Sequence, residues 1–444
     1  MKLKDITINN FRGFDDRFFE FDSKMNVVLG DNTTGKTTLL HAIQISLGAF
    51  LQEMSFLPGG IGYNRNFRPT DQVKVFSESS KGFIPIVEKP SIEVNSECVI
   101  GIFNNSTHSI EASTIPVWWK RTSNKNSKVN VSQLREFVTN MEMRRRYADQ
   151  TGSNSLFPLF LSFGATRLEK NYRGVEKTRQ RETREAKAYK YALDEQVDFK
   201  GAFDWIYRYD KNLEKGMEFV NTDNAFINAI KEAIPSIQQI NIDRKNNEFT
   251  AQIKMTKDNS PNWLTYDMMS AGFKAMINIV AEIAHRSIEL NGFLGIDAVK
   301  KTPGVIMIDE VDLYLHPHWQ QHVLSDLQSA FPEMQFVVTT HSPFIAQSVK
   351  SHNIITLDGR KGDNNPDMRS IEDIAVTEMN METARFPRYA LMVEKAEKYY
   401  QLIKSGKEDS KEANKVKKEL DEIEEQFSDD PAYVALLRAE RESQ

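Results

Sequence analysis

The residues with the clearest chemistry form a glycine-rich loop near the N-terminus. The spacing G-x-x-x-x-G-K-[ST] runs from Gly30 to Thr37, between an apolar run and a predicted helix over about Lys36 to Leu47. Glycines adopt positive φ and let phosphates approach the backbone, while successive N–H groups and the helix start favour an anion. The loop predicts a nucleoside triphosphate site, with Lys36 at the β- and γ-phosphates and the Thr37 hydroxyl on Mg²⁺. The predicted ATP-binding residues are Gly30, Asp31, Asn32, Thr33, Thr34, Gly35, Lys36, Thr37 and Thr38.

A pair of carboxylates follows a second apolar run. Gly304–Ile308 is typical of a strand buried on both faces, and Asp309 and Glu310 come directly after it. Ligands of open α/β sheets bind at the carboxyl ends of the strands. We expect Asp309 to share the Mg²⁺ with Thr37, and Glu310 to polarise the attacking water as a catalytic residue.

A histidine ends the next apolar strand. The segment Phe336-Val337-Val338-Thr339-Thr340-His341-Ser342-Pro343 again changes from apolar to polar at its end. A single histidine is more often a structural hydrogen-bonding group than a catalytic one. Its place after the carboxylate-bearing strand favours the second role, in which His341 contacts the γ-phosphate or orients the water.

An α/β core must position these segments. The alternation over residues 1–29 predicts a hairpin followed by a buried strand, and residues 50–130 predict a strand-rich insertion with long loops. Helices are predicted over 131–149 and 270–285. Further strands are predicted over 156–163, 237–253, 304–308 and 335–339. The prediction is an α/β P-loop core with an antiparallel β lobe, a helical insertion and a C-terminal helical tail.

Bulk composition restricts the class of protein. The 444 residues are 40% hydrophobic and 27% charged, with a net charge of −5 and a single cysteine, Cys98. An internal disulfide and a thiolate-cluster zinc site are therefore excluded. No apolar run approaches the roughly 20 residues of a membrane span, and the N-terminal residues alternate like a strand. These features predict a cytoplasmic protein without membrane contact.

The order of the motifs resembles that of the ABC/SMC-like ATPases, in particular the overcoming-lysogenization-defect-like, AAA-family bacterial ATPases. Asn10-Phe11-Arg12-Gly13-Phe14 matches their N-terminal segment, Asp312-Leu313 their D-loop, and His316-Pro317 a recurrent sequence. The resemblance covers about residues 1–50 and 156–360. It implies an ABC-type fold and a homodimer, or a higher even-numbered homo-oligomer, closed around ATP.

The resemblance also implies a signature motif that reads the nucleotide of the other protomer. Met269-Ser270-Ala271-Gly272-Phe273-Lys274 matches it, with Met269 in place of leucine and Ala271 in place of the first glycine. Ser270 and Gly272, at a helix start, are expected to contact ATP in trans. The Q-loop glutamine of the family is not identified by the sequence.

Four segments describe the expected domain organisation. Residues 1–163 carry the phosphate-binding loop and the β lobe, 164–260 a charged helical insertion and lobe, and 261–360 the signature, carboxylate and histidine motifs. Residues 380–444 form a helical tail with apolar stripes that need a covering surface. The stripes either pack on the chain itself or dock a partner.

The tail resembles that of the ATPases of Septu-type anti-phage systems and related retron modules. This resemblance implies an HNH nuclease as partner. Met392-Val393-Glu394 is superficially similar to the start of a Toprim nuclease domain, but no Asp-x-Asp motif follows it. We therefore expect no nuclease centre in this chain.

Two basic segments leave a nucleic-acid contact open. Arg167–Lys190 contains nine basic and four acidic residues, and Arg144-Arg145-Arg146 is a second cluster. Such runs are usually solvated helix faces, and the alternative is a contact surface for DNA, RNA or another protomer.

Three functions compete at this stage. The first is an ATPase that controls an effector nuclease in anti-phage defence. The second is a DNA-repair or recombination ATPase, which the lack of a long heptad coiled coil between the motifs disfavours. The third is an ATP sensor without hydrolysis, against which the presence of Glu310 argues.

Overall fold

A computed structural model describes residues 1–31, 33–57, 65–77, 81–85, 88–104, 107, 109–123, 128–151, 153–167, 183–195, 199–254, 261–357, 366–379, 387–406 and 410–424. The chain divides into two compact units, Met1–Arg369 and Ser370–Gln444. The subdivision of the first unit at residues 163 and 260 stays a prediction.

A five-stranded parallel sheet forms the centre of the first unit, in the order β10-β14-β15-β3-β16. Four of its strands are buried along their whole length, as expected for a sheet covered on both faces. Their bounds are β3 Met25–Leu29, β10 Leu159–Phe163, β14 Gly304–Ile308, β15 Met334–Thr339 and β16 Ile354–Thr356.

An antiparallel sheet forms the β lobe, in the order β2-β1-β6-β7-β8 with β9 paired to β6. Its long strands β6 and β7 stay in register from the pair Ser91↔Thr122 to the pair Asn104↔Ser109. The bounds are β1 Lys2–Phe11, β2 Phe14–Glu20, β6 Ser91–Asn104, β7 Ser109–Thr122, β8 Lys128–Val129 and β9 Ser153–Ser155. Within the described residues of 50–130, strands β6, β7 and β8 therefore complete the lobe that β1 begins, and β4 (Lys74–Ser77) and β5 (Gly82–Pro85) form a small hairpin.

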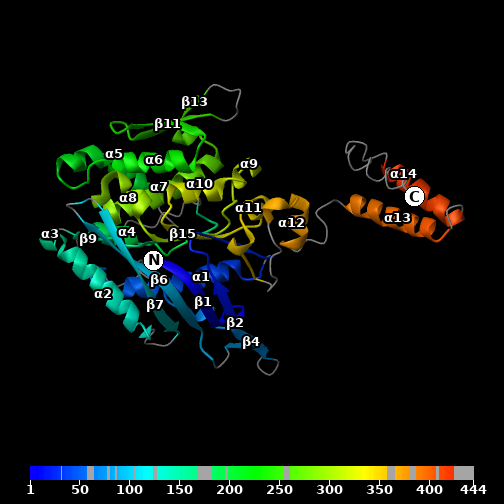
Figure 1. The fold of residues 1–444 in the computed structure, drawn as a ribbon, viewed down its shortest axis with the longest axis horizontal. Helices are drawn as coiled ribbons and strands as arrows, with labels where there is room; N and C mark the ends of the chain where they lie inside the picture. Colours follow the sequence, from blue (N-terminus) through cyan, green and yellow to red (C-terminus); the bar gives the residue numbers. More distant parts are fainter. Residues whose placement is uncertain are drawn as a thin grey trace. The chain divides into compact units, whose positions relative to one another are not determined.

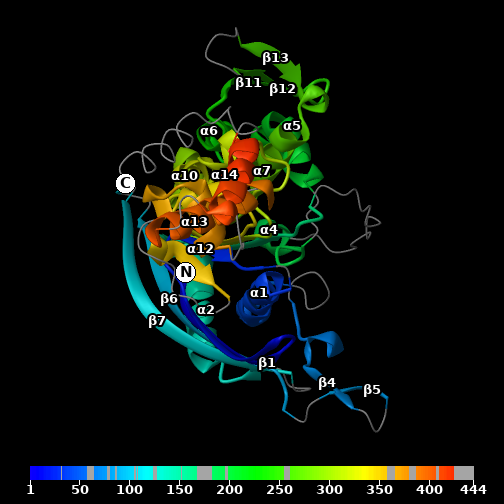
Figure 2. The same cartoon turned by 90° about the vertical axis from the view of Figure 1, so that its right-hand side faces the viewer.

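Helix α1 (Lys36–Glu53) lies in the hollow of this lobe, where β1 and β7 curve around it (Figure 2). It contacts β1, β6 and β7 on one side and β15 on the other. The indole of Trp119 on β7 donates to the Ser46 carbonyl at 3.0 Å, and Leu39–Leu51 are all buried. Burial on every side explains why α1 extends beyond the predicted end at Leu47.

Helices α4, α5, α6 and α8 gather around α7 on the other side of the parallel sheet (Figure 1), whereas α2 contacts β7 and β9 of the β lobe and α3 contacts β9. Helix α7 contacts β10 and packs against α4, α5, α6 and α8. A three-stranded antiparallel sheet of β11 (Ile237–Asp243), β12 (Glu248–Ile253) and β13 (Asn262–Thr265) adjoins α5 and α6. The helices are α2 Ser132–Arg146, α3 Ala148–Thr151, α4 Arg184–Tyr189, α5 Lys200–Glu214, α6 Thr222–Ala233, α7 Ala271–Asn291, α8 Ala298–Lys301, α9 Pro317–Gln320, α10 Val323–Ala330 and α11 Pro343–Gln347.

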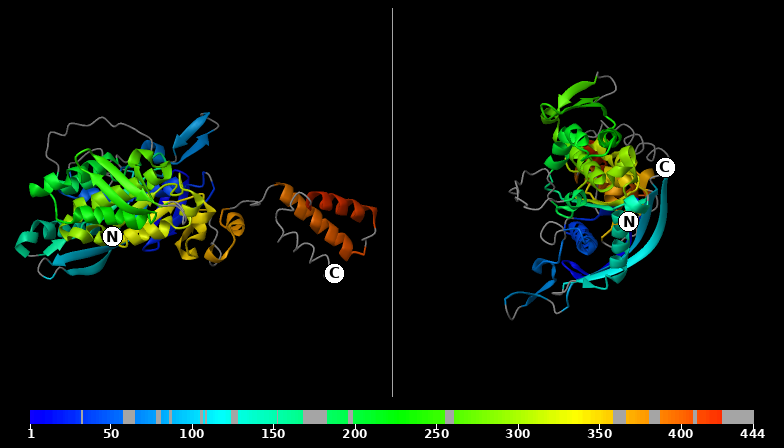
Figure 3. Two further views of the ribbon diagram at one scale, coloured as in Figure 1. Left: turned by 90° about the horizontal axis from the view of Figure 1, so that it is seen from above. Right: turned by 90° about the vertical axis from the view of Figure 1, so that its left-hand side faces the viewer.

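The second unit contains α12 (Ile371–Thr377) and a helical hairpin of α13 (Pro387–Lys404) and α14 (Lys411–Glu424). The two hairpin helices lie side by side (Figure 3, orange and red). Ala396 on α13, and Val416 and Leu420 on α14, are buried, while Leu391 is exposed. The predicted apolar stripes are thus partly used within the tail itself. The predicted break at 428–431 lies outside the described residues.

The predicted fold class is confirmed: a P-loop α/β core, an antiparallel β lobe, inserted helices and a helical tail are all present. Among the described residues, no helix has the length and apolar character that crossing a bilayer would require.

Candidate nucleotide-binding site

The carboxyl ends of three neighbouring parallel strands bring the candidate residues to one edge of the central sheet. The phosphate-binding loop follows β3, the carboxylate pair follows β14, and the segment with His341 follows β15. Strand β15 pairs with both β3 and β14, so residues far apart in sequence become neighbours. This edge is where ligands of open α/β sheets bind.

The glycine-rich loop has the backbone that its sequence predicts. Gly30 has φ of 155° and Gly35 has φ of 108°, and Thr33 is also in the left-handed region with φ of 74°. A Cβ on Gly30 would come within 2.5 Å of the Thr34 hydroxyl, and one on Gly35 within 2.7 Å of the Phe14 ring. Conformation and space therefore both require glycine at these two positions. Asn32 lies outside the described residues.

Lys36, at the first turn of α1, directs its ammonium group over the loop. Its Nζ donates to the carbonyls of Gly30 at 2.7 Å and Asp31 at 3.0 Å. Burial lowers the pKa of the ammonium, and nearby carboxylates, first that of Asp309, raise it again in part. A cation held over a helix N-terminus suits a polyphosphate, which would add the negative charge that this position favours.

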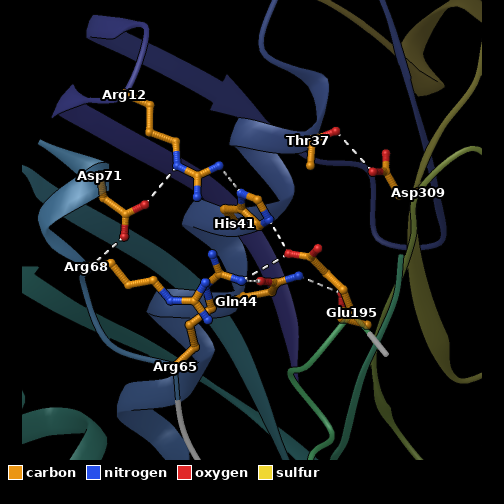
Figure 4. Close-up of polar contacts among 10 residues, drawn as sticks. Arg12, Thr37, His41, Gln44, Arg65, Arg68, Asp71, Glu195 and Asp309 are labelled. Atoms are coloured by element: carbon orange, nitrogen blue, oxygen red, sulfur yellow. Dashed lines mark hydrogen bonds and ion pairs between the residues drawn. The ribbon is translucent and has the colours of Figure 1, made fainter. Parts of the chain in front are cut away.

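Thr37 and Asp309 meet across the sheet edge. The Thr37 hydroxyl donates to Asp309 Oδ2 at 3.0 Å, although the two residues are 272 positions apart (Figure 4). Oxygen ligands from a hydroxyl and a carboxylate, next to a phosphate-binding loop, fit Mg²⁺. The donor set therefore agrees with the predicted metal residues, which would hold the ion between protein and phosphates.

Thr339, at the end of β15, organises the carboxylate pair. Its hydroxyl donates to Asp309 Oδ1 at 2.5 Å and accepts from the Glu310 N–H at 2.8 Å. Asp309 is nearly buried and its carboxylate is held by two hydroxyls, while Glu310 is half-buried. The two carboxylates thus have different surroundings, which suits the different roles predicted for them.

The segment with His341 is tied to the loop after β14. The Thr340 hydroxyl donates to Asp312 Oδ1, and the Ser342 hydroxyl donates to Gln320 Oε1 at 2.7 Å. His341 itself is exposed at the sheet edge. Its neighbours are fixed while its imidazole faces outward, so a contact with a bound phosphate stays a prediction.

The signature residues begin α7. Ser270 is the N-cap, and its side chain is exposed and makes no capping hydrogen bond. Gly272 is buried, and a Cβ there would come within 2.7 Å of the Tyr314 carbonyl. Close approach to the loop after β14 is thus one physical reason for Gly272. The contact of Ser270 and Gly272 with a second protomer's ATP stays a prediction.

A cluster of polar side chains lies next to the turn of α1 that carries Thr37, as Figure 4 shows. His41 Nδ1 accepts from Arg12, so its Nε2 carries the proton that it donates to Glu195. Glu195 also accepts from Arg65 at 3.1 Å, and Arg12 donates to Asp71 at 2.8 Å. Burial lowers the pKa of His41, and the hydrogen bond from His41 lowers the pKa of Glu195 to about 2.

Two arginines of the basic segments are engaged inside the protein. Arg145 donates to the Ser155 carbonyl at 2.9 Å and to the Leu290 carbonyl, and Arg167 is 3% exposed. The expectation of a nucleic-acid contact therefore does not extend to these two side chains. Arg144 and Arg146 are exposed, and residues 168–182 lie outside the described part of the chain.

Several residues of this region had no role assigned from sequence. His41 could have been found, because it follows Thr37 by one helical turn and faces the same side of α1. Arg12 and Thr339 lie within segments that the motifs already identified. Glu195 has no local signal, because its partner His41 is 154 positions away.

The comparisons with known proteins define the class. Residues 5–260, more than half of the chain, match the model of an AAA domain family, AAA_23. The protein therefore belongs to this AAA domain family.

Among individual proteins, it is similar to the retron Ec83 probable ATPase of Escherichia coli. The two are 26% identical over 512 residues, which cover 100% of this chain and 87% of that protein. The retron Vc95 probable ATPase of Vibrio cholerae serotype O1 biovar El Tor is 24% identical over 478 residues, covering 94% and 86%. The Septu protein PtuA of Bacillus thuringiensis is 34% identical over 96 residues, covering 21% and 23%. The expected resemblance to Septu and retron-linked ATPases is confirmed.

Proposed function

We propose that this protein binds and hydrolyses ATP, dimerises around two ATP molecules, and controls a partner nuclease of HNH type in anti-phage defence. The observation that carries the catalytic part is the 3.0 Å contact between Thr37 and Asp309. This contact brings the phosphate-binding loop and the carboxylate pair together in one site. The names of the retron and Septu relatives support the setting in defence.

The site divides the work of hydrolysis among its residues. Lys36 and the N–H groups at the start of α1 would hold the phosphates, and Thr37 and Asp309 would hold Mg²⁺, which would neutralise phosphate charge. Glu310 accepts a hydrogen bond from the attacking water and draws off its proton. His341 contacts the γ-phosphate from the neighbouring strand end.

Dimerisation would complete each site with Ser270 of the second protomer. Its exposed hydroxyl at the N-terminus of the 21-residue helix α7 is available to a γ-phosphate. We expect Glu310→Gln with ATP and Mg²⁺ to accumulate as a dimer in sedimentation velocity. The double variant Glu310→Gln, Ser270→Arg should stay monomeric under the same conditions. A dimer of equal stability in the double variant contradicts the role of Ser270.

The nuclease partner would dock on the tail. The described tail helices form a hairpin with an exposed apolar residue, Leu391, and are not needed to build the sheet edge. Deletion of residues 370–444 follows the boundary between the two units. We expect the truncated protein to fold and bind ATP, and to lose an HNH nuclease encoded beside it in co-purification. Full retention of the nuclease removes the tail from this role.

ATP hydrolysis by the purified protein tests the central claim and separates it from an ATP sensor. Phosphate release by the wild type, lost in Glu310→Gln, is the expected result. Tight ATP binding without any release favours the sensor.

A further inference from the structure

Arg167 lies directly behind the carboxylate pair, in the loop that follows β10. Its guanidinium donates from Nη1 to the carbonyls of Asp309 at 2.7 Å and Gly164 at 3.3 Å, and from Nη2 to the carbonyl of Glu310 at 2.9 Å. The side chain is 3% exposed. One planar fork thus binds two successive carbonyls of the candidate catalytic segment, a geometry that arginine provides and lysine does not.

The backbone held in this way is in an uncommon conformation. Glu310 has φ of 50°, in the left-handed region that non-glycine residues rarely adopt. Its N–H donates to the Thr339 hydroxyl, and its carbonyl accepts from Arg167 and from the Leu313 N–H at 3.0 Å. Both peptide groups of Glu310 are therefore fixed, and they determine where its side chain begins. Surroundings that over-determine a strained residue are typical of functional sites.

The charge of Arg167 is compensated by the site that it supports. Burial lowers the pKa of the guanidinium, and the carboxylates of Asp309, Asp312 and Glu310 raise it. The fork binds carbonyls of the segment, and the Asp309 carboxylate accepts from Thr37 and Thr339. A buried cation placed in this manner leaves the carboxylates to metal and water.

The loop that carries Arg167 is itself anchored. The Gly164 N–H donates to the Glu195 carbonyl at 2.9 Å, and a Cβ on Gly164 would come within 2.7 Å of the Glu195 side chain. Glu195 in turn accepts from His41 on α1. Glu195 thus links the loop that carries Arg167 to helix α1, which also carries Thr37.

We propose that Arg167 is a positioning residue for hydrolysis, which holds the left-handed turn at Glu310 so that the carboxylate reaches the attacking water. This inference rests on the proposed ATPase function. It predicts that loss of the fork lowers kcat and leaves nucleotide binding intact, because Lys36, Thr37 and Asp309 keep their contacts.

The test uses Arg167→Lys in the full chain, with Arg286→Lys as matched control. Arg286 is also buried, and its guanidinium donates to the carbonyls of Ala188 at 2.7 Å and Lys190 at 2.8 Å. We expect Arg167→Lys to lower kcat roughly 10- to 100-fold, as for a misplaced catalytic group, with KM and Kd for ATP within about twofold of wild type. Arg286→Lys should keep wild-type kcat. Unchanged kcat in Arg167→Lys, or an equal loss in both variants, overturns the inference.

Two further measurements separate positioning from general destabilisation. In the Glu310→Gln background, Arg167→Lys should add no further loss of kcat, and a multiplicative loss overturns the inference. Amide exchange at Val311 and Leu313 should rise in Arg167→Lys and stay at the wild-type rate in Arg286→Lys. Equal exchange in all three proteins also overturns it, since the turn is then held without the fork.

The outcomes distinguish this inference from the proposed function. A wild type that hydrolyses ATP, with full activity in Arg167→Lys, contradicts the inference alone. A wild type that binds ATP without turnover contradicts the ATPase function, and the catalytic role of Arg167 with it.

Discussion

Two turns of helix α1 carry polar side chains on the same face and use them differently. The first turn presents Thr37 to Asp309 through one hydroxyl contact, with Lys36 held over the loop by backbone carbonyls. The next turn presents His41, whose two ring nitrogens are both occupied, by Arg12 and Glu195. In the proposed site, the Thr37 hydroxyl and the Asp309 carboxylate exchange their contact for a metal ion, and the Lys36 ammonium group exchanges its contacts for phosphates. No ligand is proposed for His41, so its contacts with Arg12 and Glu195 stay in place when ATP binds.

The difference shows how a ligand site and its support can share one helix. Polar groups that bind a ligand must be only loosely satisfied by the protein, because each lost protein contact reduces the gain from binding. Polar groups that fix geometry are stabilising only when they are fully paired. We therefore expect substitutions at the first site to change binding or turnover, and substitutions at the second to change stability.

The largest effect is expected at Glu310. Glu310→Gln keeps the hydrogen-bonding shape but removes the base, so we expect kcat for ATP hydrolysis to fall about 10²- to 10⁴-fold. The Kd for ATP, measured by calorimetry, should stay near the wild-type value. Hydrolysis at the wild-type rate removes Glu310 from the mechanism.

Lys36→Ala should lose about 2–4 kcal/mol of ATP binding, since it removes a charge-assisted contact to the phosphates. Calorimetry with ATP measures the loss. The exposed Lys215 on the surface serves as control, and Lys215→Ala should bind like wild type. Equal affinity of Lys36→Ala and wild type contradicts the assignment of the loop.

Asp309→Ala should raise the Mg²⁺ concentration needed for half-maximal ATP binding roughly tenfold or more, because it removes the carboxylate proposed to hold the ion, directly or through water. Glu310→Gln should leave this midpoint unchanged. A Mg²⁺ titration at fixed ATP separates the two carboxylates. The same midpoint in Asp309→Ala and wild type excludes Asp309 from the metal's ligands.

His41→Ala should lower the free energy of unfolding by about 1–3 kcal/mol, since it leaves Arg12 and Glu195 without their shared partner. Its affinity for ATP should change little. Thr37→Ala is the reciprocal variant, with near wild-type stability in urea and weaker Mg²⁺-dependent ATP binding. If His41→Ala loses ATP binding as strongly as Thr37→Ala, the separation between a ligand-binding first turn and a structural second turn is wrong.

The smallest effect is a pH dependence. The folded state lowers the pKa of His41, so the unfolded chain takes up this proton first, near pH 6.5. His41 therefore makes its full contribution to the free energy of unfolding above this pH. The contribution declines as the pH falls toward and through the lower pKa of the folded state. The pKa of Glu195 is about 2 in the folded state, against about 4.3 for a free glutamate. Glu195 therefore stabilises the folded state fully above about pH 4.3, and this stabilisation is lost as the pH falls from there to about 2.

Urea unfolding between pH 7 and pH 5 measures this dependence. Wild type should lose stability over the interval, and His41→Gln should lose less. The exposed His352 provides a control, since His352→Gln should have the slope of wild type. Identical slopes in all three proteins contradict a buried neutral His41.

The sequence by itself predicted the residues of the first site. Gly30, Gly35, Lys36 and Thr37 could be assigned because the chemistry of phosphate binding imposes their types and spacing within one loop. The strand before Asp309 was identified to the residue, because a run buried on both faces must be apolar throughout. The parallel core followed from these strands and from the resemblance in motif order.

Only the tertiary structure decided what supports that site. The sequence places Arg167 in a basic segment typical of a solvated face. Its buried position depends on the pairing of β10 with β14, which no local pattern encodes. Glu195 reaches His41 across 154 positions, and β6 and β7 complete the β lobe through the pairing of β6 with β1. A local motif can be recognised from sequence because the chemistry of its ligand restricts the residue types and their spacing. A long-range contact arises from the packing of the whole chain, in which many residue types can supply the same bond.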